Sequence, residues 1–320
     1  MNKQIKNILK ITLPLVLGVF LVWYSLAKVS LSEILEYAKN ADYVWIFFGV
    51  FLGLLSHLSR SYRWLFMLEP MGYKVKFGNS VMAVFATYLI NYTIPRAGEV
   101  ARATILTNYE GVPFEKGFGT IVAERIADLI VMLGIIAITL FLQFDFIYGF
   151  LVEKFNPVKI GIGLVVCVIL GFLFLRIIKK SNSKIALKIR NFASGLIEGA
   201  LSIFKMKKKW AFIFHTLFIW GMYLLMFYVT TFSMSELEGI SAGAILIGFI
   251  SASFSIAATN GGIGSYPLAV YAAFSIFGIA EAPSIAFGWI MWASQTLMVI
   301  LFGGLSLIYL PIYNRKKTNS

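Results

Sequence analysis

Three charged residues, Arg96, Glu99 and Arg102, follow Pro95 at spacings of three within an otherwise apolar stretch. Residues three apart lie on one side of a helix, and proline is well tolerated in the first turn. The N–H groups at such a helix start attract anions, and an arginine guanidinium can hold two phosphate oxygens at once. These residues therefore predict a phosphate site. The structural alternative is that Glu99 bridges the two arginines.

A second charged group, formed by Glu124, Arg125 and Asp128, lies in the apolar segment 117–142. An ionisable side chain at the centre of a membrane helix costs about 2.5–3.5 kcal/mol, so such residues mark functional sites. Arg125 and Asp128 are three residues apart and can pair on one helix face. If they form a buried pair, removing one partner should cost about 3–5 kcal/mol. A structural pair close to the helix end, where side chains reach the membrane surface, would explain the same residues.

The segment from Thr259 to Pro267 carries no charge and contains three glycines. Glycine permits a left-handed backbone and close approach, and an Asn or Ser in this turn can cap the helix that follows. The turn lacks the Lys-Ser/Thr ending of a Walker loop, so it does not predict a nucleotide site. We expect the substrate to contact Asn260, Gly261, Gly262, Gly264, Ser265 and Pro267.

The elements that must position these residues are membrane helices. Of the 320 residues, 59% are apolar and 13% are charged, whereas a soluble domain has about 45–50% and about 25%. This composition excludes a soluble enzyme and a disordered chain. One crossing takes about 20 residues, and six apolar runs are long enough: 8–27, 43–67, 117–142, 160–178, 210–232 and 284–310.

Two further apolar stretches, residues 78–108 and 241–279, are interrupted by the Pro95 segment and by the glycine turn. Proline and glycine disfavour a continuous helix, and irregular backbone survives within a membrane only inside protein or beside a water-filled cavity. Lys and Arg are concentrated at the two ends of the chain and in residues 60–76 and 179–209, which predicts that these parts are cytoplasmic. This sidedness requires each broken stretch to enter and leave on the same face.

The sequence thus predicts an all-α polytopic membrane protein with about six full transmembrane helices and two re-entrant broken helices. Each half contains an odd number of crossings, so the halves form an inverted repeat, as in transporters whose site lies near the midplane. We expect one integral membrane domain, 1–320, with pseudo-repeat halves at about 1–145 and 155–312 and a cytoplasmic tail at 313–320. The expected location is the cytoplasmic (inner) membrane.

Other chemistry has little support in the sequence. Cys167 is the single cysteine and the chain has two histidines, so we expect neither a metal site nor a cofactor. No nucleophile has a base partner, which argues against an enzyme. His57, Arg60 and Arg63 are expected to reach the headgroups, with a direct substrate role as the alternative. Gln295 is expected to make a packing hydrogen bond.

Four motifs, taken in order, resemble the lysylphosphatidylglycerol synthase transmembrane-region family. They are Ser61-Tyr62-Arg63-Trp64, the run from Asn91 to Arg102, the run from Ala123 to Asp128, and the run from Gly261 to Pro267. The resemblance covers nearly the whole chain and implies a lipid flippase, without the soluble aminoacyl transferase found in some members. It places the functional positions at Arg96, Glu99, Arg102, Glu124, Arg125 and Asp128 and in the glycine turn.

The resulting hypothesis is a flippase that moves a phosphate-bearing phospholipid or a lipid-linked headgroup across the membrane. The alternative is a membrane-embedded transferase that acts on a lipid headgroup. The expected partners are anionic or phosphate-bearing membrane lipids and not nucleic acid, because basic residues beside membrane helices attract anionic lipids. A homo-oligomer and a separate lipid-synthesising enzyme are further candidate partners.

Overall fold

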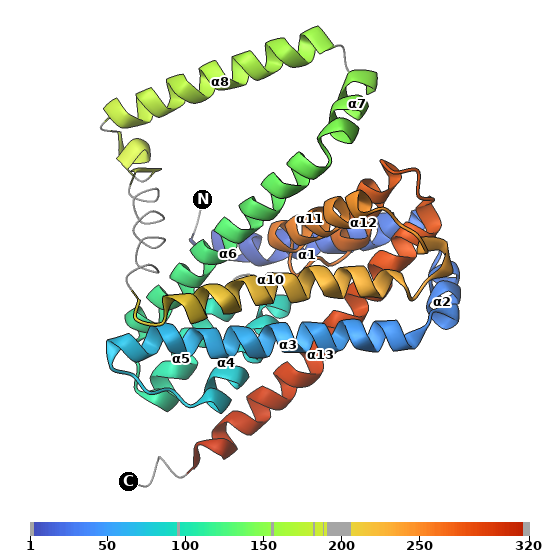
Figure 1. The fold of residues 1–320 in the computed structure, drawn as a ribbon. Helices are drawn as coiled ribbons and strands as arrows, with labels where there is room; N and C mark the ends of the chain where they lie inside the picture. The colour runs from blue at the N-terminus through green and yellow to red at the C-terminus, as the bar shows by residue number, and fades with distance from the viewer. Residues whose placement is uncertain are drawn as a thin grey trace. The chain divides into compact units, whose positions relative to one another are not determined.

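The chain is an all-α membrane protein. Its computed structural model describes residues 3–94, 97–154, 157–181, 183–187, 189–190 and 206–315, and every regular element in these ranges is a helix (Figure 1). Four helices are long and apolar enough to cross a membrane. They are α3 (Tyr43–Leu68), which continues into the short helix η1 (Glu69–Met71), α6 (Phe114–Leu142), α10 (Lys209–Thr231) and α13 (Glu281–Tyr313).

The predicted first crossing, residues 8–27, lies in α1 (Lys3–Lys28), and α2 (Leu31–Asn40) follows it at an angle of 76°. Counted as one broken span, this pair is a fifth candidate crossing. The bend has a local cause, because the Ser30 hydroxyl accepts a hydrogen bond from the Glu33 N–H and so caps the start of α2. The predicted run 160–178 lies within α8 (Pro157–Lys180), which follows α7 (Phe144–Lys154).

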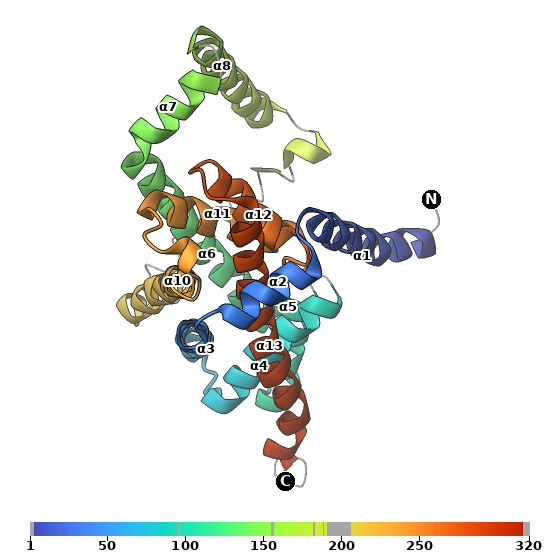
Figure 2. The same cartoon turned by 90° about the vertical axis from the view of Figure 1, so that its right-hand side faces the viewer.

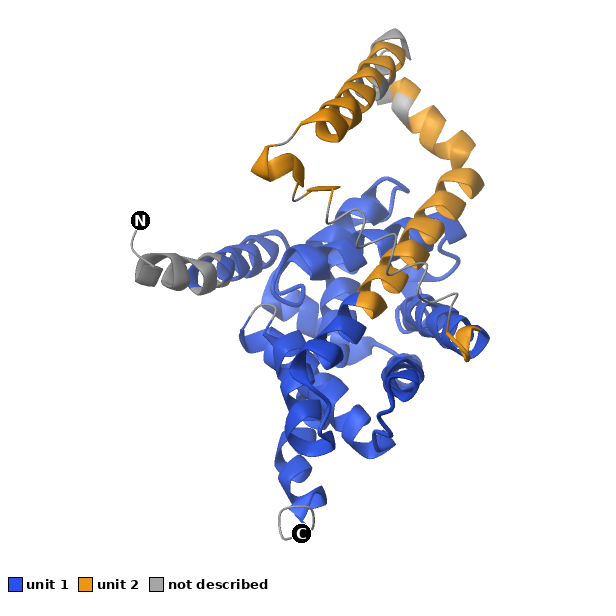
Figure 3. Ribbon diagram, turned by 90° about the vertical axis from the view of Figure 1, so that its left-hand side faces the viewer, with its two compact units in different colours: residues 1–122, 210–320 blue, residues 123–209 orange. Residues whose placement is uncertain are grey.

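The chain forms two compact units (Figure 3). The first contains residues 1–122 and 210–320, and the second contains residues 123–209. The first unit holds both of the broken stretches that the sequence predicts. The second unit holds the later part of α6 together with α7 and α8.

The first broken stretch is a helical hairpin of α4 (Phe77–Thr93) and α5 (Gly98–Glu110). Close to its tip, the Asn91 side chain accepts a hydrogen bond from the Gly98 N–H at 2.8 Å. At its open end, the Glu110 carboxylate accepts hydrogen bonds from the Asn79 amide and, at 3.3 Å, from the Lys76 N–H. The two ends of the hairpin therefore lie together, as a re-entrant element requires.

The second broken stretch folds back in the same way, as α11 (Ala242–Ala258) and α12 (Ser265–Ser275). The hydroxyls of Thr259 and Ser265 are 2.8 Å apart at the tip. Further from the tip, a Cβ added at Gly248 would lie 2.7 Å from the Phe274 ring. Because residues next to the turn pair with each other and residues far from the turn also pair with each other, the two arms run antiparallel.

The long helix α13 packs against α4 of the first hairpin and against α12 of the second (Figures 1 and 2). A Cβ at Gly303 would lie 2.7 Å from the Leu89 side chain, and the Thr296 hydroxyl donates to the Tyr92 hydroxyl at 3.3 Å. The first hairpin thus lies along the C-terminal half of α13. Its tip reaches the middle of that helix.

The second hairpin lies along the N-terminal half of α13. A Cβ at Gly288 would lie 2.9 Å from the Pro267 side chain, and the Trp292 indole donates to the Gly261 carbonyl at 2.8 Å. The two hairpins therefore approach the middle of α13 from its opposite ends. This is the arrangement that two re-entrant elements entering from opposite faces would adopt, and which face is cytoplasmic stays a prediction.

Cysteine labelling checks the predicted sidedness. In a Cys167→Ser background, single cysteines at the exposed positions Ser235 and Ala280 should react with an impermeant thiol reagent added to intact cells, because the Lys/Arg distribution places both outside. A cysteine at exposed Lys74 should react only after permeabilisation. Protection of Ser235→Cys or Ala280→Cys in intact cells would contradict the inverted repeat.

Candidate functional site

The tips of the two hairpins touch each other. The Asn260 amide donates to the backbone carbonyl of Tyr92 at 2.8 Å, and Asn260 is only 7% exposed. Gly261 has a φ of +66°, and a Cβ there would lie 2.5 Å from Cδ1 of the Tyr92 ring. Two of the sequence-predicted site residues are thus at the junction of the hairpins. We call Tyr92, Asn260, Gly261, Trp292 and Thr296 the tip junction.

The other glycines of the turn let the second hairpin pack closely against neighbouring elements. Gly264 has a φ of +69°, and a Cβ there would collide with the backbone of α1, 2.7 Å from the carbonyl carbon of Leu21. Gly262 has a φ of +81°. The helix cap differs from the predicted one, because Gly264 occupies the N-cap of α12 while Ser265 bonds to Thr259. The tip therefore depends on backbone that only glycine adopts easily.

The first predicted constellation is placed only in part, because Pro95 and Arg96 lie outside the described residues. Glu99 is half-buried in the first turn of α5 and accepts from the Asn91 amide at 3.3 Å. Arg102 is 1% exposed, and its guanidinium carbon lies 3.7 Å from the centre of the Trp64 ring. The Trp64 indole in turn donates to the Thr120 hydroxyl at 2.8 Å. Arg102 is thus held by a stacking contact that fixes α5 against α3.

The charged residues of α6 lie in the second unit. Glu124 is 1% exposed, and Arg125 and Asp128 form the predicted i,i+3 pair with 3.8 Å between nitrogen and oxygen. Only one partner of the pair is buried. The Arg125 side chain is 41% exposed, whereas that of Asp128 is 8% exposed. The spacing predicted the pair, but it could not predict which partner faces outward.

The exposure of Arg125 sets the expected effect of removing it. Arg125→Ala should lower the free energy of unfolding by less than the about 3–5 kcal/mol of a broken buried pair, because the Arg125 side chain is partly exposed. Thermal denaturation in detergent, with Arg176→Ala on exposed α8 as the matched control, measures this. A loss of more than about 3 kcal/mol would show that the pair behaves as a buried one.

Sequence reasoning missed a buried polar face on α3. His57, Arg60 and Arg63, expected to reach the headgroups, are 6%, 2% and 0% exposed. The Arg63 guanidinium donates to the Thr216 hydroxyl at 2.9 Å, and the Ser59 hydroxyl lies 2.8 Å from Nδ1 of His215. This face is buried because α3 packs against α4 on one side and meets α10 on the other. The i,i+3 spacing of these residues was the available signal.

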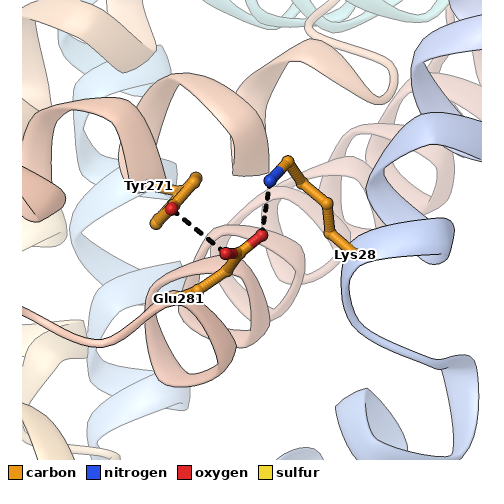
Figure 4. Close-up of polar contacts among 3 residues, drawn as sticks. All are labelled: Lys28, Tyr271 and Glu281. Carbon is orange, nitrogen blue, oxygen red and sulfur yellow. Dashed lines mark hydrogen bonds and ion pairs between the residues drawn. The ribbon is translucent and has the colours of Figure 1, made fainter.

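An ion pair lies in another part of the first unit, between α1 and α13. The Lys28 ammonium lies 2.6 Å from the Glu281 carboxylate, which also accepts from the Tyr271 hydroxyl at 3.1 Å (Figure 4). About one turn before Lys28 in α1, the Ser25 hydroxyl accepts a hydrogen bond from the Trp289 indole at 3.0 Å. These contacts join the end of α1 to the start of α13. Within the described ranges, no group of three or more His, Cys, Asp or Glu side chains could hold a metal ion.

Comparison with known proteins identifies the family. The chain is 28% identical over 130 residues to a UPF0104 membrane protein of Methanocaldococcus jannaschii, and this alignment covers 40% of this chain and 39% of that protein. It is also 28% identical over 131 residues to the glycosyltransferase AglD of Haloferax volcanii, and this alignment covers 39% of this chain and 21% of that protein. Each match thus spans less than half of the relative. The lysylphosphatidylglycerol synthase TM region family matches residues 11–303, and the chain is a multi-pass membrane protein that belongs to this family.

Proposed function

We propose that this protein is a flippase that moves a phosphate-bearing phospholipid or a lipid-linked headgroup between the leaflets of the cytoplasmic membrane. The observation that carries the proposal is the tip junction, where two hairpins that approach from opposite ends of α13 meet at its middle. A polar headgroup needs polar partners at mid-depth, and broken helices supply backbone groups and helix ends there. Both requirements favour transport across the bilayer.

The charge of the buried side chains favours a substrate that carries phosphate. Arg60, Arg63 and Arg102 are buried within the first unit, and a cationic interior attracts an anionic headgroup. Glu99 and the start of α5 lie beside the Asn91 side chain at the first hairpin tip. In this proposal, the lipid phosphate passes close to α5 and the tip junction while the acyl chains stay in the bilayer.

Reconstitution tests the proposal. In liposomes that contain the purified protein, fluorescent phospholipids of the inner leaflet should move to the outer leaflet, where added dithionite quenches them. Quenching should therefore exceed the half of the label that starts in the outer leaflet. A labelled diacylglycerol measures unassisted movement, and heat-denatured protein controls for leaky vesicles. The panel should include lipids with anionic, zwitterionic and glycosylated phosphate headgroups. Quenching that stops at the outer leaflet for every phosphate-bearing lipid would refute the flippase.

The alternative, a membrane-embedded transferase, is favoured by one observation, the match to a protein named as a glycosyltransferase. The same proteoliposomes can test it. Incubation with sugar nucleotides, followed by mass spectrometry of the extracted lipids, should leave the lipids unchanged if the protein only transports. A lipid that gains a sugar mass in the presence of active protein would favour the transferase.

Arg96 provides a prediction from the sequence alone. Arg96→Lys keeps the positive charge but loses the two-pronged fit to phosphate oxygens, so flipping of phosphate-bearing lipids should fall strongly. Expression and melting temperature should stay close to wild type. Lys76→Gln, at the start of α4, is the control and should have little effect. A wild-type flipping rate in Arg96→Lys would move the search for the phosphate site to Glu124 and Asp128.

A further inference from the structure

A cluster of hydrogen-bonding side chains, buried on α3 and half-buried on the other three helices, lies between α3, α4, α10 and α13. Four helices supply its members, which we call the donor cluster: Ser56, His57 and Arg60 of α3, Tyr88 of α4, Tyr223 of α10 and Gln295 of α13. The three α3 residues are 0%, 6% and 2% exposed. None of these six residues belongs to the tip junction or to the charged positions that the family resemblance singles out.

The centre of the donor cluster is the Tyr223 side chain, whose hydroxyl lies within hydrogen-bonding reach of the side chains of Ser56, Arg60 and Tyr88. The His57 ring completes one wall, with its centre 4.5 Å from that of Tyr88 and 6.3 Å from that of Tyr223. Side chains from three helices thus converge on one point. The chemistry at that point is a guanidinium, hydroxyls and an imidazole.

Gln295 connects the donor cluster to the tip junction. A Cβ at Gly53 would collide with Oε1 of Gln295, so the amide lies directly against α3 at this glycine. The Gly53 carbonyl accepts from the Ser56 hydroxyl at 2.7 Å, so Gln295 contacts α3 one helical turn before Ser56 of the cluster. The next residue of α13, Thr296, donates to Tyr92 of the tip junction. The two sites therefore adjoin along α13.

Two polar atoms of the donor cluster lack a protein partner. Within the described part of the chain, Nδ1 of His57 and Nε2 of Gln295 are buried and make no hydrogen bond. A buried polar group without a partner is costly, and native structures rarely keep one unless water or a ligand serves it. The Gln295 amide nitrogen can only donate, so its missing partner must be an acceptor.

We propose that the donor cluster is a binding site for the phosphate group of a lipid. The Gln295 amide and the Arg60 guanidinium donate hydrogen bonds, and a phosphodiester presents acceptor oxygens with a negative charge. The site would hold the headgroup beside the tip junction, at the middle of α13. This inference rests on the proposed flippase function and assigns to it a second set of substrate-binding residues.

Binding measurements on the full-length protein in an uncharged detergent test the proposal. The probe is dihexanoylphosphatidylglycerol, with dihexanoylglycerol as the phosphate-free control. Tyr223→Phe and Gln295→Leu each remove one hydrogen-bonding group and should raise the Kd for the phospholipid at least tenfold. Tyr228→Phe is the matched control, because it makes the same change on an exposed part of α10, and should leave the Kd unchanged.

The source of the phosphate is decided by competition. If inorganic phosphate displaces the phospholipid at a similar concentration, the site recognises the free anion. If it does not, the site recognises a lipid phosphate. Equal binding of the phospholipid and of dihexanoylglycerol would overturn the proposal, and so would an unchanged Kd in both Tyr223→Phe and Gln295→Leu.

The melting temperature of the lipid-free protein separates a binding role from a structural one. Because the Gln295 amide nitrogen has no partner, Gln295→Leu should leave that temperature unchanged or raise it. A lower melting temperature would assign Gln295 to the protein's own packing and overturn its role as a ligand donor. Liposome assays separate this inference from the flippase. If the wild-type protein does not flip lipids but the variants bind the phospholipid more weakly, only the proposed flippase function is refuted. If the wild-type protein flips lipids and both variants bind the phospholipid as it does, only the proposed binding site is refuted.

Discussion

Gly264→Ala is expected to lose most of its folded yield, because the new Cβ atom destabilises the fold in two separate ways. The φ of +69° is left-handed, which costs a residue with a Cβ about 1–2 kcal/mol. The new Cβ would also collide with the α1 backbone at Val22 and lie 2.7 Å from Leu21, and overpacking costs about 1–3 kcal/mol. Their sum is a large part of a typical stability of about 5–15 kcal/mol. Fluorescence-detected size exclusion and thermal denaturation measure the loss.

Gly278→Ala is the matched control for Gly264→Ala. Gly278 has a φ of +75°, but a Cβ there would meet no atom within 4 Å. It should therefore lose only the backbone cost of about 1–2 kcal/mol. Equal losses in the two variants would contradict the close seating of the second hairpin on α1. A greater loss in Gly264→Ala would show that α1 helps to hold the tip junction in place.

The positions of the helices could be predicted from the sequence because their causes are local. A bilayer fixes the length of a crossing, so the apolar run 117–142 located α6, and the run 284–310 located α13. The Pro95 segment and the glycine turn also act locally, since they interrupt backbone hydrogen bonding where they stand. The two hairpins meet close to their tips, through the bond from Asn260 to Tyr92.

The buried polar face of α3 could not be predicted in the same way. Its spacing identified one side of a helix, but burial depends on the helices that cover that side. Tyr223 and Thr216, which bond to Arg60 and Arg63, are far away in the sequence. The sequence alone therefore predicts Arg60 and Arg63 at the headgroups, whereas the fold buries them.

The predicted roles of individual turn residues failed for a related reason. Ser265 follows the glycine turn at a position suited to a helix cap, but it bonds to Thr259 of the other arm. Asn260 could have capped the same helix, but it bonds to Tyr92 of the first hairpin. A partner brought close by folding displaced the local interaction in both cases. The residue types were informative, while their partners depended on tertiary structure.

The bond from Asn260 to Tyr92 leads to the second large effect. Asn260→Asp keeps the shape of the side chain but replaces the donating amide by a carboxylate oxygen, which faces the Tyr92 carbonyl and repels it. Losing a buried hydrogen bond costs about 1–3 kcal/mol. Each 1.4 kcal/mol corresponds to about a tenfold change in rate. If the tip junction must be correctly formed for transport, flipping at neutral pH should fall about tenfold or more.

Acidic buffer should partly restore flipping in Asn260→Asp, because a protonated carboxyl group can donate to the Tyr92 carbonyl again. The wild-type protein, measured in the same buffers, corrects for the pH dependence of the lipids and of the assay. Asn108→Asp introduces the same charge on an exposed part of α5 and should flip at the wild-type rate at every pH. Wild-type flipping by Asn260→Asp at neutral pH would show that transport does not need this bond. A rate that stays low in acid would mean that the hydrogen bond alone does not account for the loss.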